Sequence, residues 1–243
     1  MNHLDLFSGI GGFALGLERA GFKTVGFCEI EKYPRKILEK HWPAVKIYGD
    51  IRDVTKEGLR ADGIVPDIIT GGFPCQDISQ AGGQAGISGD RSGLWSELHR
   101  IIGEVQPKYA VMENVTNLIA GDRGRWFGRV LGDLAEIGYD AEWHCIPASY
   151  AGRQTLRDRI WIVAYPNGKG LEGCWEYIKR ARKWPTWESV EEQVWFQSAA
   201  RNGRVAARIP DRSYRIKGVG NSVTPDIVEI IGNAIKGIEN GNI

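Results

Sequence analysis

The sequence predicts an α/β fold, a doubly wound and mostly parallel sheet with helices on both faces. Short apolar runs alternate with longer amphipathic stretches from residue 1 to residue 165, a pattern typical of parallel strands joined by crossover helices. Several of these runs end in glycine-rich or acidic turns, as strands do where such sheets bind ligands. The 243 residues suffice for one such domain and a small addition, but not for two large domains.

Seven strands and three helices follow from the pattern. The strands are expected over residues 3–7, 24–28, 45–48, 67–70, 109–113, 143–147 and 159–165. Helices are expected over residues 13–20, before Gly21, and over residues 34–41. Residues 227–238 carry isoleucine, valine and alanine at helical spacing, which predicts a last amphipathic helix.

Composition excludes several classes of protein. Hydrophobic residues make up 42% and charged residues 25%, as in an ordinary soluble globular protein. No apolar run approaches the ~20 residues that cross a membrane, and the first residues do not resemble a secretory signal. The four cysteines, Cys28, Cys75, Cys145 and Cys174, form no CxxC pair, so neither a zinc site nor a disulfide framework is expected. A reducing, cytoplasmic setting fits this usage.

Two segments interrupt the alternating pattern, and basic residues are in excess in the region around the second of them. Residues 76–93 hold five glycines without an apolar period, which indicates a functional or disordered loop. Residues 166–211 hold four tryptophans among charged residues, which indicates an insertion. Residues 153–217 contain 14 Lys and Arg against 7 Asp and Glu, although the net charge is only +1. This excess is either a solvated basic face or a phosphate-contacting surface, and charge alone does not decide between them.

Three strand ends suit a nucleotide-like ligand. The first predicted strand ends in a turn rich in glycine, residues 8–12, which brings bare backbone close to a ligand. The second ends at Glu29, whose carboxylate can accept bonds from ribose hydroxyls. Asp50 and Ile51 follow the third and suit an adenine edge and face. Standing alone, the first turn could be a tight connection without a ligand, but the three together match an adenosyl group.

Cys75 is the candidate nucleophile. It follows Pro74 in a glycine-flanked turn at a strand end, whereas most lone cysteines are inert core residues. Glu113 ends the next strand and should share the same edge of the sheet, as should Arg157 and Arg159. Taken by themselves, these three charged residues could equally be a helix-capping carboxylate and surface partners of one another.

Together these residues resemble the cytosine-C5 methyltransferases of DNA. Five segments are similar to motifs of that family in the family's order and span residues 5 to 225. They are Asp5–Phe13, Gly72–Gln76 with the catalytic cysteine, Glu113–Val115, Arg157–Arg159 and Gly220–Pro225. The resemblance implies the fold of a methyltransferase dependent on S-adenosylmethionine (SAM), with a shortened target-recognition insertion.

The resemblance assigns roles to individual residues. It implies that Cys75 adds to C6 of cytosine, that Glu113 holds or protonates N3 and the exocyclic amine, and that Arg159 and Arg157 fix the base at O2. SAM is the implied methyl donor, and no metal is needed. The residues expected at the methyl donor are Phe7, Gly9, Gly11, Gly12, Glu29, Ile30, Asp50, Ile51, Pro74, Leu94, Asn221, Ser222 and Val223.

A base inside a duplex hides C6 from a thiol, so the resemblance also implies base flipping. The glycine-rich segment 76–93 is then expected to close over the flipped base, with Gln76 or a residue in 79–84 filling the vacated stack. The pattern departs from the family at Gln154, which lies one residue too early before Arg157. The insertion is also short; its basic run at residues 179–183 suits DNA contact, but its tryptophans could equally form a minimal core.

Domains, partners and rival functions complete the expectations. The catalytic unit is expected over residues 1–165, the insertion over 166–211, and a C-terminal segment packing back on the catalytic unit over 212–243. The implied partners are double-stranded DNA and a cognate restriction endonuclease, for a monomer in the cytoplasm of a prokaryote or encoded by a phage. The rivals are methylation of RNA cytosine, a DNA-binding protein without activity, and a cysteine hydrolase, which needs a base near the thiol.

Overall fold

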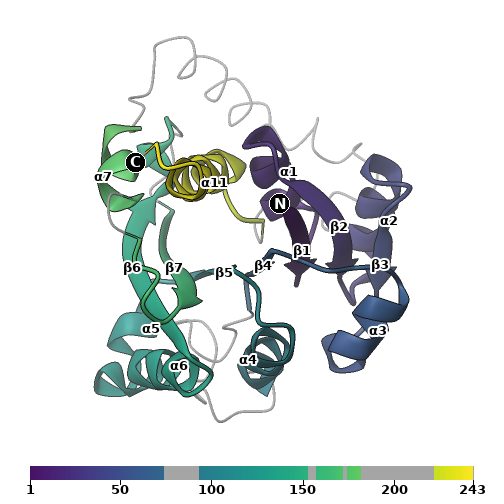
Figure 1. The fold of residues 1–243 in the computed structure, drawn as a ribbon, viewed down its shortest axis with the longest axis horizontal. Helices are drawn as coiled ribbons and strands as arrows, with labels where there is room; N and C mark the ends of the chain where they lie inside the picture. The colour runs from purple at the N-terminus through teal and green to yellow at the C-terminus, as the bar shows by residue number, and fades with distance from the viewer. Residues whose placement is uncertain (74–92, 153–156, 172–173, 182–221, 243) are drawn as a thin grey trace, which may run out of the picture.

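The computed structural model describes residues 1–73, 93–152, 157–171, 174–181 and 222–242, and within these ranges it confirms the α/β fold (Figure 1). The strands form one seven-stranded sheet in the order β3-β2-β1-β4-β5-β7-β6. Their bounds are β1 Asn2–Leu6, β2 Lys23–Cys28, β3 Lys46–Tyr48, β4 Ile68–Gly71, β5 Tyr109–Val115, β6 Tyr139–Pro147 and β7 Asp158–Pro166.

Helices cover both faces of the sheet (Figure 1). The α-helices are α1 Gly12–Arg19, α2 Lys32–His41, α3 Lys56–Ala61, α4 Gly93–Val105, α5 Asn117–Ala120, α6 Arg125–Glu136, α7 Cys174–Arg180 and α11 Pro225–Glu239. Short 3-10 turns are η1 Ile51–Asp53, η2 Gly121–Gly124 and η3 Ala148–Tyr150. One core lies between the sheet and α3, α4 and α6, and a second lies between the sheet and α1, α7 and α11.

Strand direction fixes where the functional residues can meet. The pairs from β3 to β5 are parallel, so β1, β2, β3, β4 and β5 end at the same edge of the sheet. Strand β7 is antiparallel to β5, and Val115 lies opposite Arg159. The beginning of β7 therefore lies at the edge where the parallel strands end. The prediction of a mostly parallel sheet is confirmed, with β7 as the one reversed strand among the described elements.

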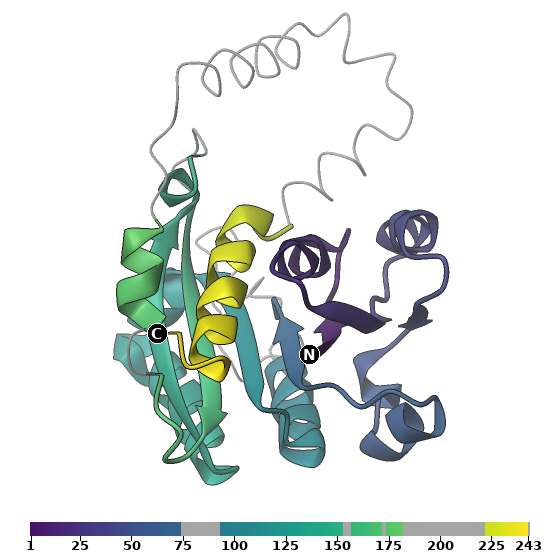
Figure 2. The same ribbon diagram turned by 45° about the horizontal axis from the view of Figure 1, so that its top comes forward.

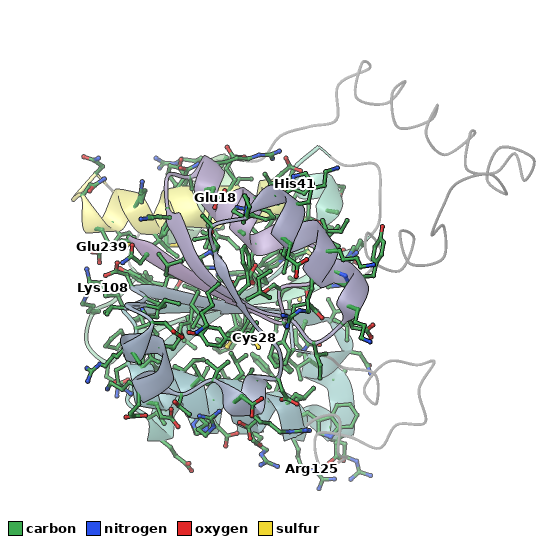
Figure 3. The ribbon with its side chains drawn as sticks, turned by 90° about the vertical axis from the view of Figure 1, so that its right-hand side faces the viewer. Glu18, Cys28, His41, Lys108, Arg125 and Glu239 are labelled. Carbon is green, nitrogen blue, oxygen red and sulfur yellow. The ribbon has the colours of Figure 1, made fainter. Side chains whose placement is uncertain are left out.

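The C-terminal helix packs against α1 in both views (Figures 1 and 2). Its buried residues, among them Ile227 and Ile231, belong to the same core as Phe13 and Leu17 of α1. At its far end, Glu239 accepts a hydrogen bond of 2.9 Å from the Tyr109 hydroxyl at the beginning of β5, beside Lys108 (Figure 3). Helix α11 is thus packed against α1 and hydrogen-bonded to the beginning of β5.

Part of the expected insertion also belongs to this core. Leu171, Cys174 and Ile178 are buried among residues of β7 and α11. Residues 182–211, with Trp184, Trp187 and Trp195, lie outside the described residues. The described beginning of the insertion therefore packs on the sheet domain.

The surroundings of two glycines, Gly16 at the contact between α1 and α11 and Gly128 in α6, predict opposite effects of substitution. A Cβ atom on Gly16 would lie 2.5 Å from Val228 Cβ, whereas one on Gly128, inside α6, would meet nothing within 4 Å. We expect Gly16→Ala to lower the free energy of unfolding by about 1–3 kcal/mol through overpacking. Gly128→Ala should raise it by about 0.4–1 kcal/mol, because alanine loses less backbone entropy in a helix. Urea denaturation measures both, and a Gly16→Ala variant as stable as the parent would contradict the close packing.

Candidate active site

The turn between β1 and α1 requires glycine at particular positions. Phe7, Gly9 and Gly11 have positive φ angles of 54°, 53° and 86°, a region that favours glycine. A Cβ on Gly12 would lie 2.5 Å from Ser222 Oγ, whereas one on Gly9 would meet nothing within 4 Å. The turn is therefore closed on its Gly12 side by the segment before α11 and open at Gly9.

Glu29 connects the first turn to the second. Its carboxylate accepts hydrogen bonds of 2.7 Å from the backbone N–H groups of Gly9 and Glu31. Only 8% of the residue is exposed, and burial raises the pKa of the carboxyl although the backbone donors favour the charged form. The carboxylate is thus fixed beside the open position at Gly9.

At the second and third turns, the exposed apolar side chain is not the one that the sequence suggests for adenine. Ile30 is 68% exposed, a large apolar side chain left open next to Glu29. Ile51 is buried in the core of α3, α4 and α6, so its side chain supports the turn from below. The Asp50 side chain accepts a hydrogen bond of 2.9 Å from Arg52 N and begins η1. The exposed apolar surface at these turns is Ile30.

Arg35, which the sequence analysis did not identify, joins the second and third turns. Its Nη1 donates to the backbone oxygens of Glu29 and Tyr48, both at 3.2 Å. Residue spacing gives no signal for this role, because Arg35 lies on the surface side of a charged helix and finds its acceptors only when β2 and β3 pair. The guanidinium fixes the strand ends that carry Glu29 and Ile30.

The backbone before Cys75 is held by the end of β5. Pro74 and Cys75 lie outside the described residues, but Gly72 and Phe73 are described. Asn114 Nδ2 donates to the Phe73 backbone oxygen at 3.3 Å, while its Oδ1 accepts from Val115 N at 2.8 Å. The amide of Asn114 therefore anchors the chain two residues before the candidate nucleophile.

Glu113 lies beside the turn that leads to Cys75. A Cβ on Gly72 would be 3.5 Å from Glu113 Oε2, so this carboxylate faces the turn that leads to Cys75. Arg159 Nε lies 2.9 Å from Glu113 Oε1, and Arg157 Nη2 lies 4.0 Å from it. Burial raises the pKa of the Glu113 carboxyl, although both guanidinium groups act in the opposite direction. One acid and two arginines therefore converge at this sheet edge, as the sequence predicts.

Segment 74–92 is bracketed by an aromatic contact. Phe73 and Trp95 have ring centroids 5.1 Å apart, and Trp95 Nε1 donates to Asp133 Oδ2 of α6 at 2.7 Å. Leu94 packs against the core that contains Trp95. The residues that flank this segment, Phe73 and Trp95, therefore lie in contact.

The remaining predicted residues fall into two groups. Ser222 and Val223 lie against Gly12, and Val223 is buried in the core of α1 and α11. Gln154 and Asn221 lie outside the described residues, as does the segment from Gln76 to Ser92. Among the described residues, no cluster of His, Cys, Asp and Glu could hold a metal ion. No helix in the described ranges has the length and apolar character needed to cross a membrane.

The other three cysteines lie where burial disfavours the thiolate. Burial raises the pKa of Cys28 and of Cys174 to about 12, and it also raises the pKa of Cys145. Cys28 lies inside the molecule at the end of β2 (Figure 3). Of the four cysteines, the three that are described lack an environment that favours the thiolate.

The four histidines, all within the described ranges, do not lie in the turns of the candidate site. His3 is fully buried near the beginning of β1, where its ring nitrogens contact Thr24 Oγ1 at 3.2 Å and Thr70 Oγ1 at 2.8 Å. His41 ends α2, His99 lies in α4, and His144 lies in β6. No histidine therefore lies beside Glu113, Arg159 or Gly72 in the contacts that the structure gives these residues.

Comparisons with known proteins agree with this geometry. The family model for C-5 cytosine-specific DNA methylases matches residues 1–204. Type II methyltransferase M2.BsuMI of Bacillus subtilis is 36% identical over 170 residues, covering 68% of this chain and 42% of that protein. Type II methyltransferase M.Sau3AI of Staphylococcus aureus is 31% identical over 247 residues, covering 95% of this chain and 56% of that protein.

A solved structure shares the fold. The Dnmt2 methyltransferase of S. pombe superposes with a TM-score of 0.58 at 22% identity, covering 75% of this chain and 57% of that one. The chain spans about half the length of the curated relatives that it matches.

Proposed function

The chain belongs to the family of C-5 cytosine-specific DNA methylases, and on that basis we propose that it transfers a methyl group from SAM to C5 of cytosine in DNA. The observation that carries the proposal is the convergence of Glu113, Arg159 and the Gly72 turn at one sheet edge. The turn at Gly9 with the Glu29 carboxylate ends at the same edge. The acid, the cations that would hold the base and the donor crevice then share the sheet edge from which the turn with Cys75 begins.

The residues of the three turns fit SAM. The open position at Gly9 admits the methionine part beside the positive-φ backbone, and Glu29 is placed to accept bonds from the ribose hydroxyls. Ile30, 68% exposed, offers an apolar face for adenine. Val223 closes the crevice from the segment before α11. SAM supplies a methyl group on a positively charged sulfur, which is the electrophile that C5 of cytosine requires.

Cytosine C5 is too weak a nucleophile without activation. In the proposed reaction the Cys75 thiolate forms a bond to C6, and the electrons of the C5–C6 double bond move through the ring toward N3. Glu113, whose pKa is raised by burial, donates its proton to N3 as negative charge develops there. Arg159, and Arg157 beside it, bind O2 and orient the ring.

Methyl transfer then completes the cycle. C5 forms a bond to the methyl carbon, and the electrons of the carbon–sulfur bond remain on the departing sulfur. A base, such as a water molecule, takes the C5 proton and N3 returns its proton to Glu113. The C5–C6 double bond then forms again and the Cys75 thiolate leaves. The positions of the two reacting carbons supply much of the rate, because orientation converts an encounter into a reaction within one complex.

The target base must leave the duplex for this chemistry. C6 is inaccessible to a thiol inside stacked DNA, so we propose that cytosine is flipped into the site between Glu113 and the Cys75 turn. Selection of the target sequence is assigned to residues 166–211, whose basic and tryptophan residues suit phosphate and groove contact. A restriction endonuclease partner and a monomeric state remain predictions for this chain.

Parallel transfer assays test the proposed function. We expect labelled methyl groups from SAM to appear in duplex DNA and not in transfer RNA, with single-stranded DNA as a third acceptor. Label in RNA alone would overturn the DNA assignment and favour the RNA rival. Absence of label in every acceptor, together with specific DNA binding, would favour a binding protein without activity.

A further inference from the structure

Two buried polar atoms on β5 and β7 lack a regular hydrogen-bond partner among the residues that the structure describes. They are Glu113 Oε1, an acceptor, and Trp161 Nε1, a donor. Glu113 and Trp161 lie directly opposite each other in the antiparallel β5–β7 pair. Opposite residues project their side chains to the same face of a sheet, with Cβ atoms about 4.5–5.5 Å apart. An unused donor therefore neighbours a carboxylate oxygen that makes an ion pair with Arg159 but no regular hydrogen bond.

The ring of Trp161 is fixed at this position. The residue is 2% exposed, and its ring meets Phe13 edge to face with centroids 6.0 Å apart. Phe13 in turn reaches the turn before Cys75, since its Cε2 lies 4.0 Å from the position of a Cβ on Gly72. Buried polar atoms are almost always hydrogen-bonded, and exceptions tend to mark sites where another group completes the set. Trp161 thus lies between the first helix and the acid, with its N–H available.

Glu113 has a particular need for a second donor. Its Oε1 contacts Arg159 Nε at 2.9 Å without the alignment of a regular hydrogen bond, and Arg157 Nη2 is 4.0 Å away. Arg159 of β7 and Arg157, the residue before that strand, are the charged groups that face it. The adjoining residues of β4 and the first turn of α1 carry no charge. In the proposed reaction Arg159 binds O2 of cytosine, which weakens its hold on the carboxylate.

We propose that Trp161 is a positioning residue for methyl transfer. Its indole N–H donates to the Glu113 carboxylate, directly or through one water molecule, and holds the acid toward N3 while Arg159 engages the base. This inference rests on the proposed function and assigns a role to a residue outside the five family motifs. It gives β7 two donors for one acid, one charged and one neutral.

The pH profile of a variant tests the proposal. Trp161→Phe keeps an aromatic ring against Phe13 but removes the donor. The indole N–H stabilises the charged carboxylate, so its loss should raise the pKa of Glu113 further. We expect the limb on which activity falls with rising pH to move upward by about 0.5–1 pH unit. The single-turnover rate of methyl transfer at neutral pH should fall about 3- to 10-fold, as the acid loses its orientation.

A matched tryptophan separates positioning from a structural effect. Trp126 lies on α6, against the opposite face of the sheet, and Trp126→Phe makes the same chemical change there. This control should lower stability without moving the pH profile. A Trp161→Phe profile superimposable on the parent's, or an equal shift in Trp126→Phe, would overturn the proposal. An inactive parent protein would instead overturn the proposed function.

If the Trp161→Phe chain does not fold, a spectroscopic measurement on the unsubstituted protein tests the proposal instead. The Trp161 indole N–H resonance of the otherwise unchanged protein should titrate with Glu113, and Glu113→Gln should remove that titration. An indole resonance that is constant across the titration would overturn the proposed contact.

Discussion

Replacement of Glu113 with glutamine should lower the rate of methyl transfer by about 10²- to 10⁴-fold, the usual contribution of a positioned acid or base. Glutamine keeps the shape of the side chain beside Gly72 and Arg159 but cannot donate a proton to N3. Single-turnover transfer to duplex DNA at saturating SAM measures the effect. Glu136→Gln, an exposed position at the end of α6, is the matched control and should leave the rate unchanged.

The stability of Glu113→Gln should change in the opposite sense. Burial raises the pKa of Glu113 in the folded chain, so the folded state binds the proton more tightly than the unfolded state. Its contribution to stability is therefore complete below the unfolded pKa, about 4.3 for glutamate. That contribution is lost as pH rises through the folded pKa. Relative to the parent, the variant should gain stability between mildly acidic and neutral pH, by urea denaturation. A rate loss explained by unfolding would contradict the assigned role.

Replacement of Glu29 with glutamine should weaken SAM binding by about 10- to 100-fold, because hydrogen bonds to a charged acceptor are the stronger kind. The carboxylate now accepts from Gly9 N and Glu31 N, and an amide nitrogen in place of one oxygen would face a donor. The first turn should therefore lose its fixed position as well as its ribose acceptor. Calorimetric titration with SAM measures the affinity.

Helix α2 offers the matched control for Glu29. Glu39 is exposed on the same connection between β2 and β3, and Glu39→Gln should bind SAM as the parent does. If Glu29→Gln bound SAM with unchanged affinity, the assignment of the crevice to the three turns would be wrong. A KM for SAM that rises while kcat is preserved is the kinetic counterpart of the expected loss.

The sequence predicted the sheet well where strands end in distinctive turns. Gly9 lies three residues after β1, and Glu29 and Gly72 directly follow β2 and β4. A short apolar run before each of these turns predicts the strand. It underestimated β6, expected from residue 143 but beginning at Tyr139. The four extra residues, 139–142, include the polar Asp140 and Glu142 and lie on an edge strand. Their conformation is determined by pairing with β7.

Helices without strong local signals were not individually predicted. Helix α6 contains Gly128 and Gly132 in its interior, which reduce helix propensity, and its burial of Val130 and Leu134 against the sheet compensates. Helix α4 begins at Gly93, directly at the end of the glycine-rich segment, and glycine has a low helix propensity. In both cases tertiary packing outweighs the local sequence.

The sequence likewise predicted some residues of the candidate site and not others. Glu113, Arg159 and Glu29 were predicted because motif order and strand ends place them, and the structure brings Glu113 and Arg159 to 2.9 Å. Arg35 and Trp161 were not predicted, since their roles depend on which residue faces which across paired strands. Such contacts follow from register and crossing geometry, which no spacing along one chain reveals.

The most direct test of the central claim is covalent trapping at Cys75. Fluorine at C5 of cytosine cannot leave as a proton does, so the bond between the cysteine and C6 should persist after methyl transfer. With SAM and a pool of duplexes carrying 5-fluorocytosine at varied positions, we expect a denaturation-resistant complex of the parent protein. Cys75→Ser should form none. No complex from the active parent, or an equal complex from Cys75→Ser, would contradict the account.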